Sequence, residues 1–551
     1  MKQCIQCKSS FEITDEDRDF YQKIKMPAPK LCPNCRQQER LAWRNERQLY
    51  HQTCDLCKKN TISVYHKESP FIVYCQECWW SDHWNPIEYE REFDFERSFF
   101  EQFCELMIKV PRPAILNRNS ENSEYTHICE NNRNCYLLVE SSTNENCLYG
   151  YWIQKSKHCV DCSHCNECEW CYECENCKQG YNLFFSQNCQ TCSDSWFLKN
   201  CIGCKNCFGC ANLHHKEFYI FNEPHSKEEY GKKIITLKPH TYPEVIKTKQ
   251  TFEKWRQEQF YKYAEITSSE NCTGDYISES KDCYECYNAS QARDCRYSHH
   301  VWRDTKDNMD VDTVGMNSDL NYQCINTAIN SHHNLGCARC WGVSDSYYSN
   351  ECDYSQNLFG CIGLRHKKYC IFNKQYSKKE YHRMVERIVK HMVKTGEWGL
   401  FFPRNLSPFG YNETVAQERF PLQKENAERL GFKWSDVKTE PPEAKKKIQS
   451  SKLPDSIELI PDDILNWAIE CEDSKTPFKI TAQELLFYRK KGLPIPHLHP
   501  DIRHKKRMKL RNPQKLHHRK CAKCQSEIQT TYSPDRSEIV YCEHCYLKNI
   551  Y

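Results

Sequence analysis

Cysteine pairs with the spacing Cys-x2-Cys recur near both ends of the chain. They form three quartets, whose members are Cys4, Cys7, Cys32 and Cys35; Cys54, Cys57, Cys75 and Cys78; and Cys521, Cys524, Cys542 and Cys545. Four thiolates from two such pairs are the usual ligands of a structural zinc ion, and such a site leaves no position open for a reaction. The sequence therefore predicts three structural Zn2+ sites and leaves room for more.

The composition favours metal ligation over disulfide bonds. The chain has 551 residues, of which 40 are cysteines. Its start lacks the charged segment and apolar run of a secretory signal, and no stretch approaches the roughly 18 apolar residues of a membrane span. We therefore expect a cytoplasmic protein with reduced thiols. The net charge of +3 is too small to predict a nucleic-acid partner from the total.

The N-terminal cysteine module is repeated near the C-terminus without a gap. The offset that aligns Cys4 with Cys471 also aligns Cys54 with Cys521. The second copy has lost three ligands, because Ser474, His499 and Ile502 stand where the first copy has cysteines. We expect the unit from 471 to 504 to keep its fold through packing. It should bind metal weakly, through Cys471 and His499, or not at all.

Short elements must bring the paired cysteines together. The segment around Phe11 favours a strand, and Thr14 with Asp17 fits a capping box that opens a helix. The pair Cys32-x2-Cys35 then begins another helix. In the second quartet, the residues between its two pairs alternate as in a hairpin.

An arginine row follows the first quartet and is kept in the second copy. Arginines at i, i+4 and i+8 share one helix face, and the residues concerned are Arg36, Arg40 and Arg44 and then Arg503, Arg507 and Arg511. Lys506 and neighbouring lysines add charge to the second row. Neutralisation of phosphates is one interpretation, which predicts a nucleic-acid-binding face. A solvated helix face, or pairing with the acidic stretch at 88–105, is the alternative.

Two related segments fill the middle of the chain. FGC-x2-L and SKEEY within 208–230 recur as FGC-x2-L and SKKEY within 359–381. Inside each half the cysteines follow a period of twelve residues, often directly after an asparagine. A short fixed period without helical spacing predicts a β-solenoid whose turns stack about 4.8 Å apart. Cysteines would pack inside, and asparagines would occupy the bends.

One run of cysteines fits this interpretation poorly. Seven cysteines stand at every third position from 159 to 177, namely Cys159, Cys162, Cys165, Cys168, Cys171, Cys174 and Cys177. We expect that a twelve-residue coil cannot turn all of them toward one core. Further zinc, a thiolate cluster or an iron–sulfur centre are alternatives to core packing, although the ferredoxin-type cysteine run is absent.

Helices and connectors separate these units. Helices that begin after a serine should cap both solenoid halves, and a basic-aromatic helix is expected at 248–265. The predicted units are a zinc ribbon at 1–50, a second at 51–84, a helical connector at 85–119, solenoid half 1 at 120–230, a connector at 231–268, solenoid half 2 at 269–395, a polar helix and linker at 396–456, the degenerate ribbon copy at 457–515 and a third zinc ribbon at 516–551.

Two resemblances accompany these motifs. Residues 4–40, CIQCKSSFEITDEDRDFYQKIKMPAPKLCPNCRQQER, resemble a probable zinc-ribbon family of bacterial proteins, which implies zinc binding. The whole chain is similar to cysteine-rich zinc-ribbon proteins of ultra-small uncultivated bacteria, notably in PFGYNETVAQE at 408–418. Some of those proteins are labelled CoA-transferase-like, but no acyl-carrying carboxylate motif can be placed here. The likeness implies a bacterial cytoplasmic setting.

The sequence as a whole predicts a mainly β, multidomain protein with tandem zinc ribbons at both ends and two duplicated solenoid segments between them. No nucleotide-binding loop, metalloprotease motif or nucleophile elbow is present, so we expect no enzymatic activity and no small-molecule substrate. We expect a zinc-binding scaffold that contacts RNA or DNA, with a ribonucleoprotein as one such setting, through its arginine-rich helices. The alternative is a protein–protein interaction scaffold that uses the solenoid faces, and an enzyme of unknown type is a remote third.

Overall fold

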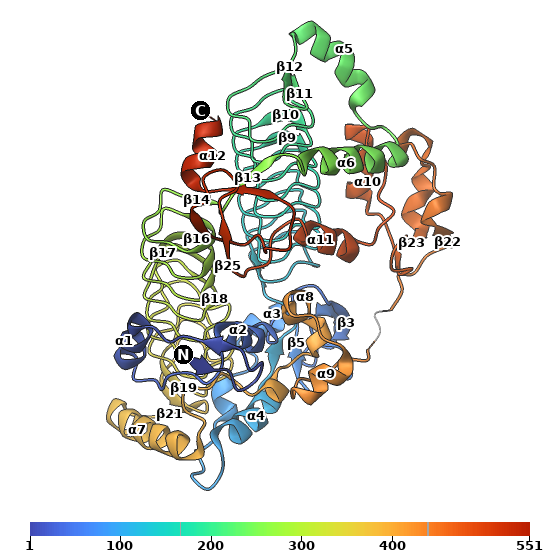
Figure 1. The fold of residues 1–551 in the computed structure, drawn as a ribbon. Coiled ribbons are helices and arrows are strands. Elements are labelled where there is room, and N and C mark those ends of the chain that lie inside the picture. The colour runs from blue at the N-terminus through green and yellow to red at the C-terminus, as the bar shows by residue number, and fades with distance from the viewer. Residues whose placement is uncertain (166, 438–439, 551) are drawn as a thin grey trace.

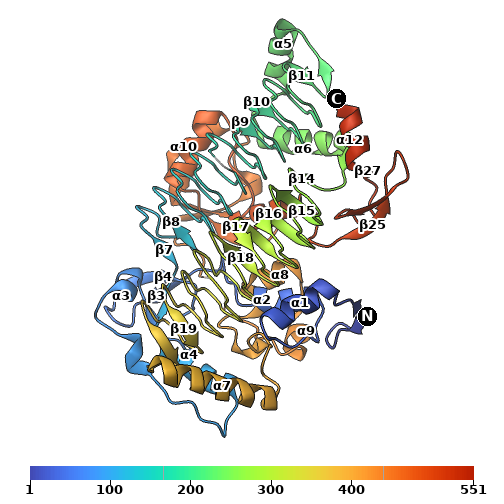
Figure 2. The ribbon, with the colours of Figure 1, turned by 90° about the vertical axis from the view of Figure 1, so that its left-hand side faces the viewer.

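The computed structural model of the chain describes residues 1–165, 167–437 and 440–550. Two stacks of short turns lie side by side at its centre: stack 1 (residues 117–220) and stack 2 (residues 266–371), teal and yellow-green in Figure 1. The N-terminal and C-terminal segments pack against these stacks (Figures 1 and 2). Position 439, where the predicted linker begins, and Asn166 in the cysteine run lie outside the described residues.

Helices and strands occupy similar shares of the chain, so the fold is mixed where we expected mainly β structure. The helices are α1 Asp15–Lys23, α2 Pro33–Leu41, α3 Gln76–Trp80, α4 Phe99–Lys109, α5 Lys227–Leu237, α6 Tyr242–Arg256, α7 Lys378–Thr395, α8 Val415–Arg419, α9 Lys424–Arg429, α10 Ala482–Lys491, α11 Pro500–Met508 and α12 Glu543–Ile550. Among the described residues, none of these helices combines the length and the apolar character needed to cross a membrane.

Backbone pairing in stack 1 follows the twelve-residue period. Each pairing position bridges in parallel to the residue twelve further on, as in the series Tyr136, Leu148, Val160, Tyr172 and Phe184. Most pairings are single bridges, and the longer strands are β9 Tyr181–Phe184 and β10 Ser193–Trp196. The period read from the sequence is therefore the offset between successive turns.

Each turn is built from triplets. Every third residue has a positive φ, for example 52° at Asn134, 50° at Leu137 and 50° at Glu140. This left-handed conformation bends the chain after each bridge, and asparagine adopts it more readily than most residues. The asparagine ladder also forms, because Asn134 Nδ2 donates to Asn146 Oδ1 at 3.3 Å.

Stack 2 has the same construction with longer strands. Its parallel sheet runs through β14 Ile266–Thr267, β15 Gly274–Ser278, β16 Cys286–Arg293, β17 His299–Lys306 and β18 Asp312–Gly315, and β19 Gln356–Phe359 and β20 Lys368–Ile371 end the stack. Three successive turns carry one additional residue, so the bridges from Met309 to Tyr322 and from Tyr322 to Leu335 span thirteen positions.

Helices α5 and α7 follow the last turns of the two stacks, at opposite ends of the molecule (Figure 1). Both helices begin after a serine, as the sequence predicted, and Ser226 and Ser377 each close a capping box with a glutamate three residues later. The basic-aromatic helix α6 begins earlier than expected and ends at Arg256. The chain then forms β13 Phe260–Lys262, which pairs in parallel with β27 Ile539–Tyr541 of the C-terminal cysteine module.

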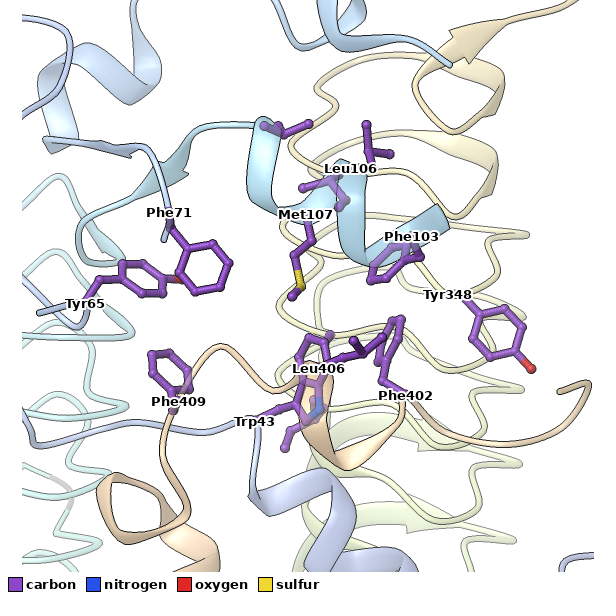
Figure 3. Packing of buried hydrophobic residues seen from close by; sticks show 14 of the residues in the cluster. Trp43, Tyr65, Phe71, Phe103, Leu106, Met107, Tyr348, Phe402, Leu406 and Phe409 are labelled. Carbon is purple, nitrogen blue, oxygen red and sulfur yellow. The ribbon is translucent and has the colours of Figure 1, made fainter. Parts of the chain in front are cut away.

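The N-terminal modules join stack 2 through an aromatic core (Figure 3). The Trp43 ring stacks on Phe402 at 4.5 Å, and Phe103 of α4 packs on the same phenylalanine at 4.9 Å. Tyr348 of stack 2 closes this group at 6.1 Å from Phe402. Buried aromatic rings contribute much of the packing energy of such a core, so this cluster fixes residues 41–107 and 401–409 against stack 2.

Candidate metal centres and the buried arginine rows

The structure brings each cysteine quartet together. In the part of the chain that it describes, the four Sγ atoms of each of the three quartets lie within 4.8 Å of one another. Short Sγ–Sγ distances join the two pairs of each quartet: 3.6 Å from Cys7 to Cys32 and 3.7 Å from Cys524 to Cys542. Such a group of four thiols is the donor set expected for a tetrahedral metal ion.

Local backbone geometry orients the thiols. The first pair of each quartet lies in a tight turn closed by a residue with positive φ, namely Lys8, Lys58 and Gln525. The first sulfur then accepts a hydrogen bond from the backbone N–H of the third cysteine, at 3.4 Å for Cys4 and Cys32. Cys32 is also the N-cap of α2, and the positive end of a helix favours a thiolate.

In two of the quartets hydrogen bonds favour the thiolate form, which a metal requires, at one cysteine, while the hydrogen bond with Cys32 raises the pKa of Cys35 and burial raises the pKa of Cys545. The hydroxyl and the backbone N–H of Ser526 lower the pKa of the Cys524 thiol to about 6. A hydrogen bond from Cys35 lowers the pKa of Cys32 to about 4. These four-thiolate groups fit a zinc ion, and the donor chemistry offers no place for a reacting substrate.

The degenerate copy keeps the turn but not the ligand group. Lys475 has the same positive φ, and the His499 backbone N–H donates to Cys471 Sγ at 3.2 Å. The His499 ring turns elsewhere, because its Nδ1 accepts from the Asp501 N–H at 3.1 Å. Within the described ranges, Cys471 and His499 therefore belong to no group of three potential ligands.

The seven-cysteine run is core, and our expectation that it could not face one interior is wrong. All seven side chains are buried. The chain bends once in every three residues, so every third side chain points into the stack. Cysteines at every third position can therefore all face the interior. The thiols reach backbone carbonyls, as Cys177 does at 3.6 Å to Glu175 and 3.5 Å to Ser186. Among the residues described, the run forms no metal-ligand group.

The first arginine row is buried, so it offers no nucleic-acid-binding face in this structure. Arg36, Arg40 and Arg44 are at most 3% exposed. Arg36 Nε lies 2.7 Å from Asp310 of stack 2, and Arg40 Nε lies 2.9 Å from Asp312. The physical reason is that these carboxylates stand at the docking face of stack 2, where guanidinium groups pair in a planar, directed way.

The second row repeats this docking on stack 1. Arg503 and Arg507 both pair with Asp161, at 2.9 Å and 2.6 Å, and the side chain of Asp161 is fully buried. Each docking site also contains a tyrosine that donates to an acid of the module's first helix. The two bonds are Tyr297 to Asp17 at 3.1 Å and Tyr149 to Glu484 at 2.7 Å. Each module therefore docks on its stack through one interface, used twice.

The third arginine of each row joins the two stacks. Arg44 donates to Thr313 of stack 2 at 3.0 Å and pairs with Glu140 of stack 1. Arg511 lies 3.1 Å from Glu175 of stack 1, and its ring contact with Tyr276 of stack 2 spans 4.1 Å. Buried guanidiniums at these places link both modules to both stacks.

The lysines of the second row differ from its arginines. Lys505 and Lys506 lie exposed on α11, Lys509 is exposed at its C-cap, and Lys515 lies exposed beyond it. Lys506 pairs with Asp473 at 2.9 Å. The exposed charge of this helix is therefore carried by lysine.

Sequence reasoning missed the carboxylates that receive the arginines. Asp310 follows Tyr297 by one thirteen-residue turn, and Asp161 follows Tyr149 by one twelve-residue turn. A tyrosine followed by an aspartate one turn later in both halves was a signal that could have found them. No protein-family model matches the chain, and a search of curated proteins finds no match.

Proposed function

We propose that this protein is a non-enzymatic, zinc-stapled scaffold of the bacterial cytoplasm. Its two stacks act as β-solenoid segments whose surfaces bind a partner protein, and its cysteine modules hold the stacks in a fixed relation. The observation that carries this proposal is the pair of buried arginine rows. Their guanidinium groups pair with carboxylates of the two stacks, so this charge holds the modules in place.

Zinc has a specific part in this proposal. Each module is too small to build a large core, and four thiolates on a metal ion can supply the missing stability. In the first module the quartet fixes the start of α2, and α2 carries Arg36 and Arg40 into the docking site. Metal ligation in the first quartet therefore supports the docking of the module on stack 2.

Chelation tests the proposal. A strong zinc chelator should release the N-terminal module, whose α2 carries Arg36 and Arg40, so the particle expands in small-angle X-ray scattering while the far-UV signal of the stacks persists. Nuclease-treated bacterial extract should yield a stoichiometric protein partner on the metal-loaded protein and little on the stripped protein. Unchanged scattering after complete zinc loss, or no protein partner on the loaded protein, would count against the scaffold.

A second candidate function is contact with RNA or DNA. The residues that would make this contact are the exposed lysines at α11, because the arginines are buried. Such contact must weaken with salt, because it depends on release of counterions from phosphates. Replacing Lys505 and Lys509 with glutamine should abolish salt-dependent binding in a filter assay, while leaving the fold intact. If the unaltered protein does not bind RNA or DNA at low salt, this candidate function is refuted.

A further inference from the structure

A pocket of about 70 Å³ lies between the two stacks. Three tryptophans line it: Trp152 from stack 1, and Trp302 and Trp341 from stack 2. Ile128 and Met316 add apolar surface, and no cysteine of the three quartets contributes. The Trp152 and Trp302 rings are 6.0 Å apart in an edge arrangement, so the two stacks meet at this wall.

The wall from stack 2 is formed by its additional residues. Two consecutive residues have positive φ at Arg303–Asp304, Met316–Asn317 and Ile329–Asn330, where other corners have one. These extra residues fall at the same corner of successive turns, and Met316 and Ile329 line the pocket. The pocket thus coincides with a repeated local change in the turn, at the edge that faces stack 1.

Three residues that line the same pocket carry a buried polar atom without a hydrogen-bond partner in the described part of the chain: Glu140 and Asn326 each have such an acceptor, and Trp302 has such a donor in its Nε1. Glu140 is 6% exposed; its Oε1 accepts from Thr313 at 3.1 Å, while its Oε2 has no hydrogen-bond partner in the described part of the chain. Asn326 is 3% exposed, and its Oδ1 also lacks a partner there. A buried acceptor without a donor costs stability. The two acceptors outnumber the single donor and one of them is a carboxylate oxygen, so a ligand that brings hydrogen-bond donors fits this pocket.

The charge of the lining is acidic. Glu130 lines the pocket and has no ion-pair partner among the residues described. Arg44 pairs with Glu140 but is shared with Glu46. Arg339, one turn beyond Asn326, is engaged with Glu351 at 3.0 Å. Tryptophan faces attract cations, and nearby carboxylates reinforce that attraction.

We infer that this pocket binds a primary alkylammonium group, supplied by a free polyamine or by the side chain of a lysine. The ammonium N–H groups would satisfy Glu140 Oε2 and Asn326 Oδ1, and the methylenes would lie against the tryptophans and Met316. A quaternary ammonium would satisfy the rings but not the acceptors, since it has no N–H donor. A neutral alcohol would lack the charge that Glu130 favours.

Titration of the full-length, metal-loaded protein with cadaverine tests this inference. Tryptophan fluorescence and calorimetry should both show saturable binding, and 1,5-pentanediol and tetramethylammonium should bind more weakly. Asn326→Leu keeps the side-chain volume and should weaken cadaverine about tenfold or more, the effect of losing a hydrogen bond to a charged group. Glu130→Gln should weaken it about threefold, as for a partly exposed charge pair. Glu217→Gln, an exposed bridge-position glutamate of stack 1, is the matched control and should bind normally.

The source of the ammonium is resolved by a second titration. Tighter binding of spermidine or cadaverine than of Nα-acetyl-lysine N-methylamide identifies a polyamine, and the reverse order identifies a lysine. Equal binding of cadaverine and pentanediol would overturn the inference, as would unaltered affinity in the folded Asn326→Leu and Glu130→Gln variants. No saturable binding of either amine would overturn it as well. Circular dichroism of each variant establishes that it is folded.

Discussion

Replacing Asp161 with asparagine is the sharpest test of the docking interface. Asp161 is fully buried in stack 1; it forms an ion pair with Arg503 at 2.9 Å and accepts a hydrogen bond from Arg507 at 2.6 Å. The substitution keeps the size of the side chain but removes the charge that both guanidiniums face. Arg503 still has Glu484 at 2.9 Å, whereas Arg507 retains, among the residues described, the hydrogen bond to the Tyr149 carbonyl at 3.2 Å.

The expected magnitude follows from the burial of the pair. Removing one partner of a buried ion pair costs about 3–5 kcal/mol, because the remaining charge stays desolvated and unpaired. Pairing within the exposed Lys506–Asp473 pair, whose side chains are 55% and 44% accessible, is worth at most about 1 kcal/mol. Asp473→Asn is therefore the matched control on the same module.

Hydrogen exchange measured by mass spectrometry suits this prediction, because a protein of several units need not unfold in one step. A loss of 3 kcal/mol in local stability corresponds to roughly a hundredfold faster exchange in α10 and α11. Arg507→Met should accelerate exchange as well. In the double variant the two effects should not add, because the second change removes the charge that the first left unpaired.

An exchange rate in α11 within about twofold of the unaltered protein would refute the reasoning. It would mean that Arg503 and Arg507 do not depend on Asp161 in solution, and the interpretation of the row as a phosphate-binding face would return. Additive effects in the double variant would likewise refute the reasoning, because they would mean that Asp161 and Arg507 stabilise the module independently of each other.

Three further predictions concern the metals, the pH dependence and the core. Elemental analysis should find three zinc ions per chain, and Cys54→Ser should reduce this to two and expose its module to protease; three ions in that variant would contradict the site. Burial lowers the pKa of His299 to about 3 and of His164 to about 4, so below pH 6.5 the unfolded chain binds protons first. The free energy of unfolding should therefore fall between pH 6.5 and 5 by up to about 1.4 kcal/mol per pH unit for each histidine, and His164→Asn should flatten this dependence in chemical denaturation. In the core, Cys174→Ser should be tolerated better than Cys174→Leu, because extra methylenes in a packed interior cost about 1–3 kcal/mol; equal melting temperatures would contradict inward packing.

The local features of this protein could be predicted from its sequence. Ligand spacing selects the quartets because the paired cysteines sit in one tight turn. Capping boxes at Thr14, Ser226 and Ser377 depend only on residues three positions apart, and all three form. The twelve-residue period could be read from repeated asparagines, because asparagine adopts the left-handed bend readily and recurs at the same corner of successive turns, as at Asn134 and Asn146.

The direction of the inward side chains could not be predicted so simply. We assumed that a twelve-residue coil has too few inward positions for the run from Cys159 to Cys177. The bend after every bridge gives one inward position in each triplet, a fact that depends on backbone conformation. The cysteine spacing of three did contain this information, but only together with the left-handed φ at the preceding residue.

Sequence by itself determined which cysteines form groups that could hold a metal, which residues cap several of the helices and which arginines share a helix face. Only the tertiary structure decided what that face meets, because the partner of Arg36 lies 274 positions away. Helical spacing places three arginines in a row whether they face phosphates, water or carboxylates. Here the stacks place buried aspartates opposite both rows, and the energetic cost of an unpaired buried charge fixes each cysteine module on its stack.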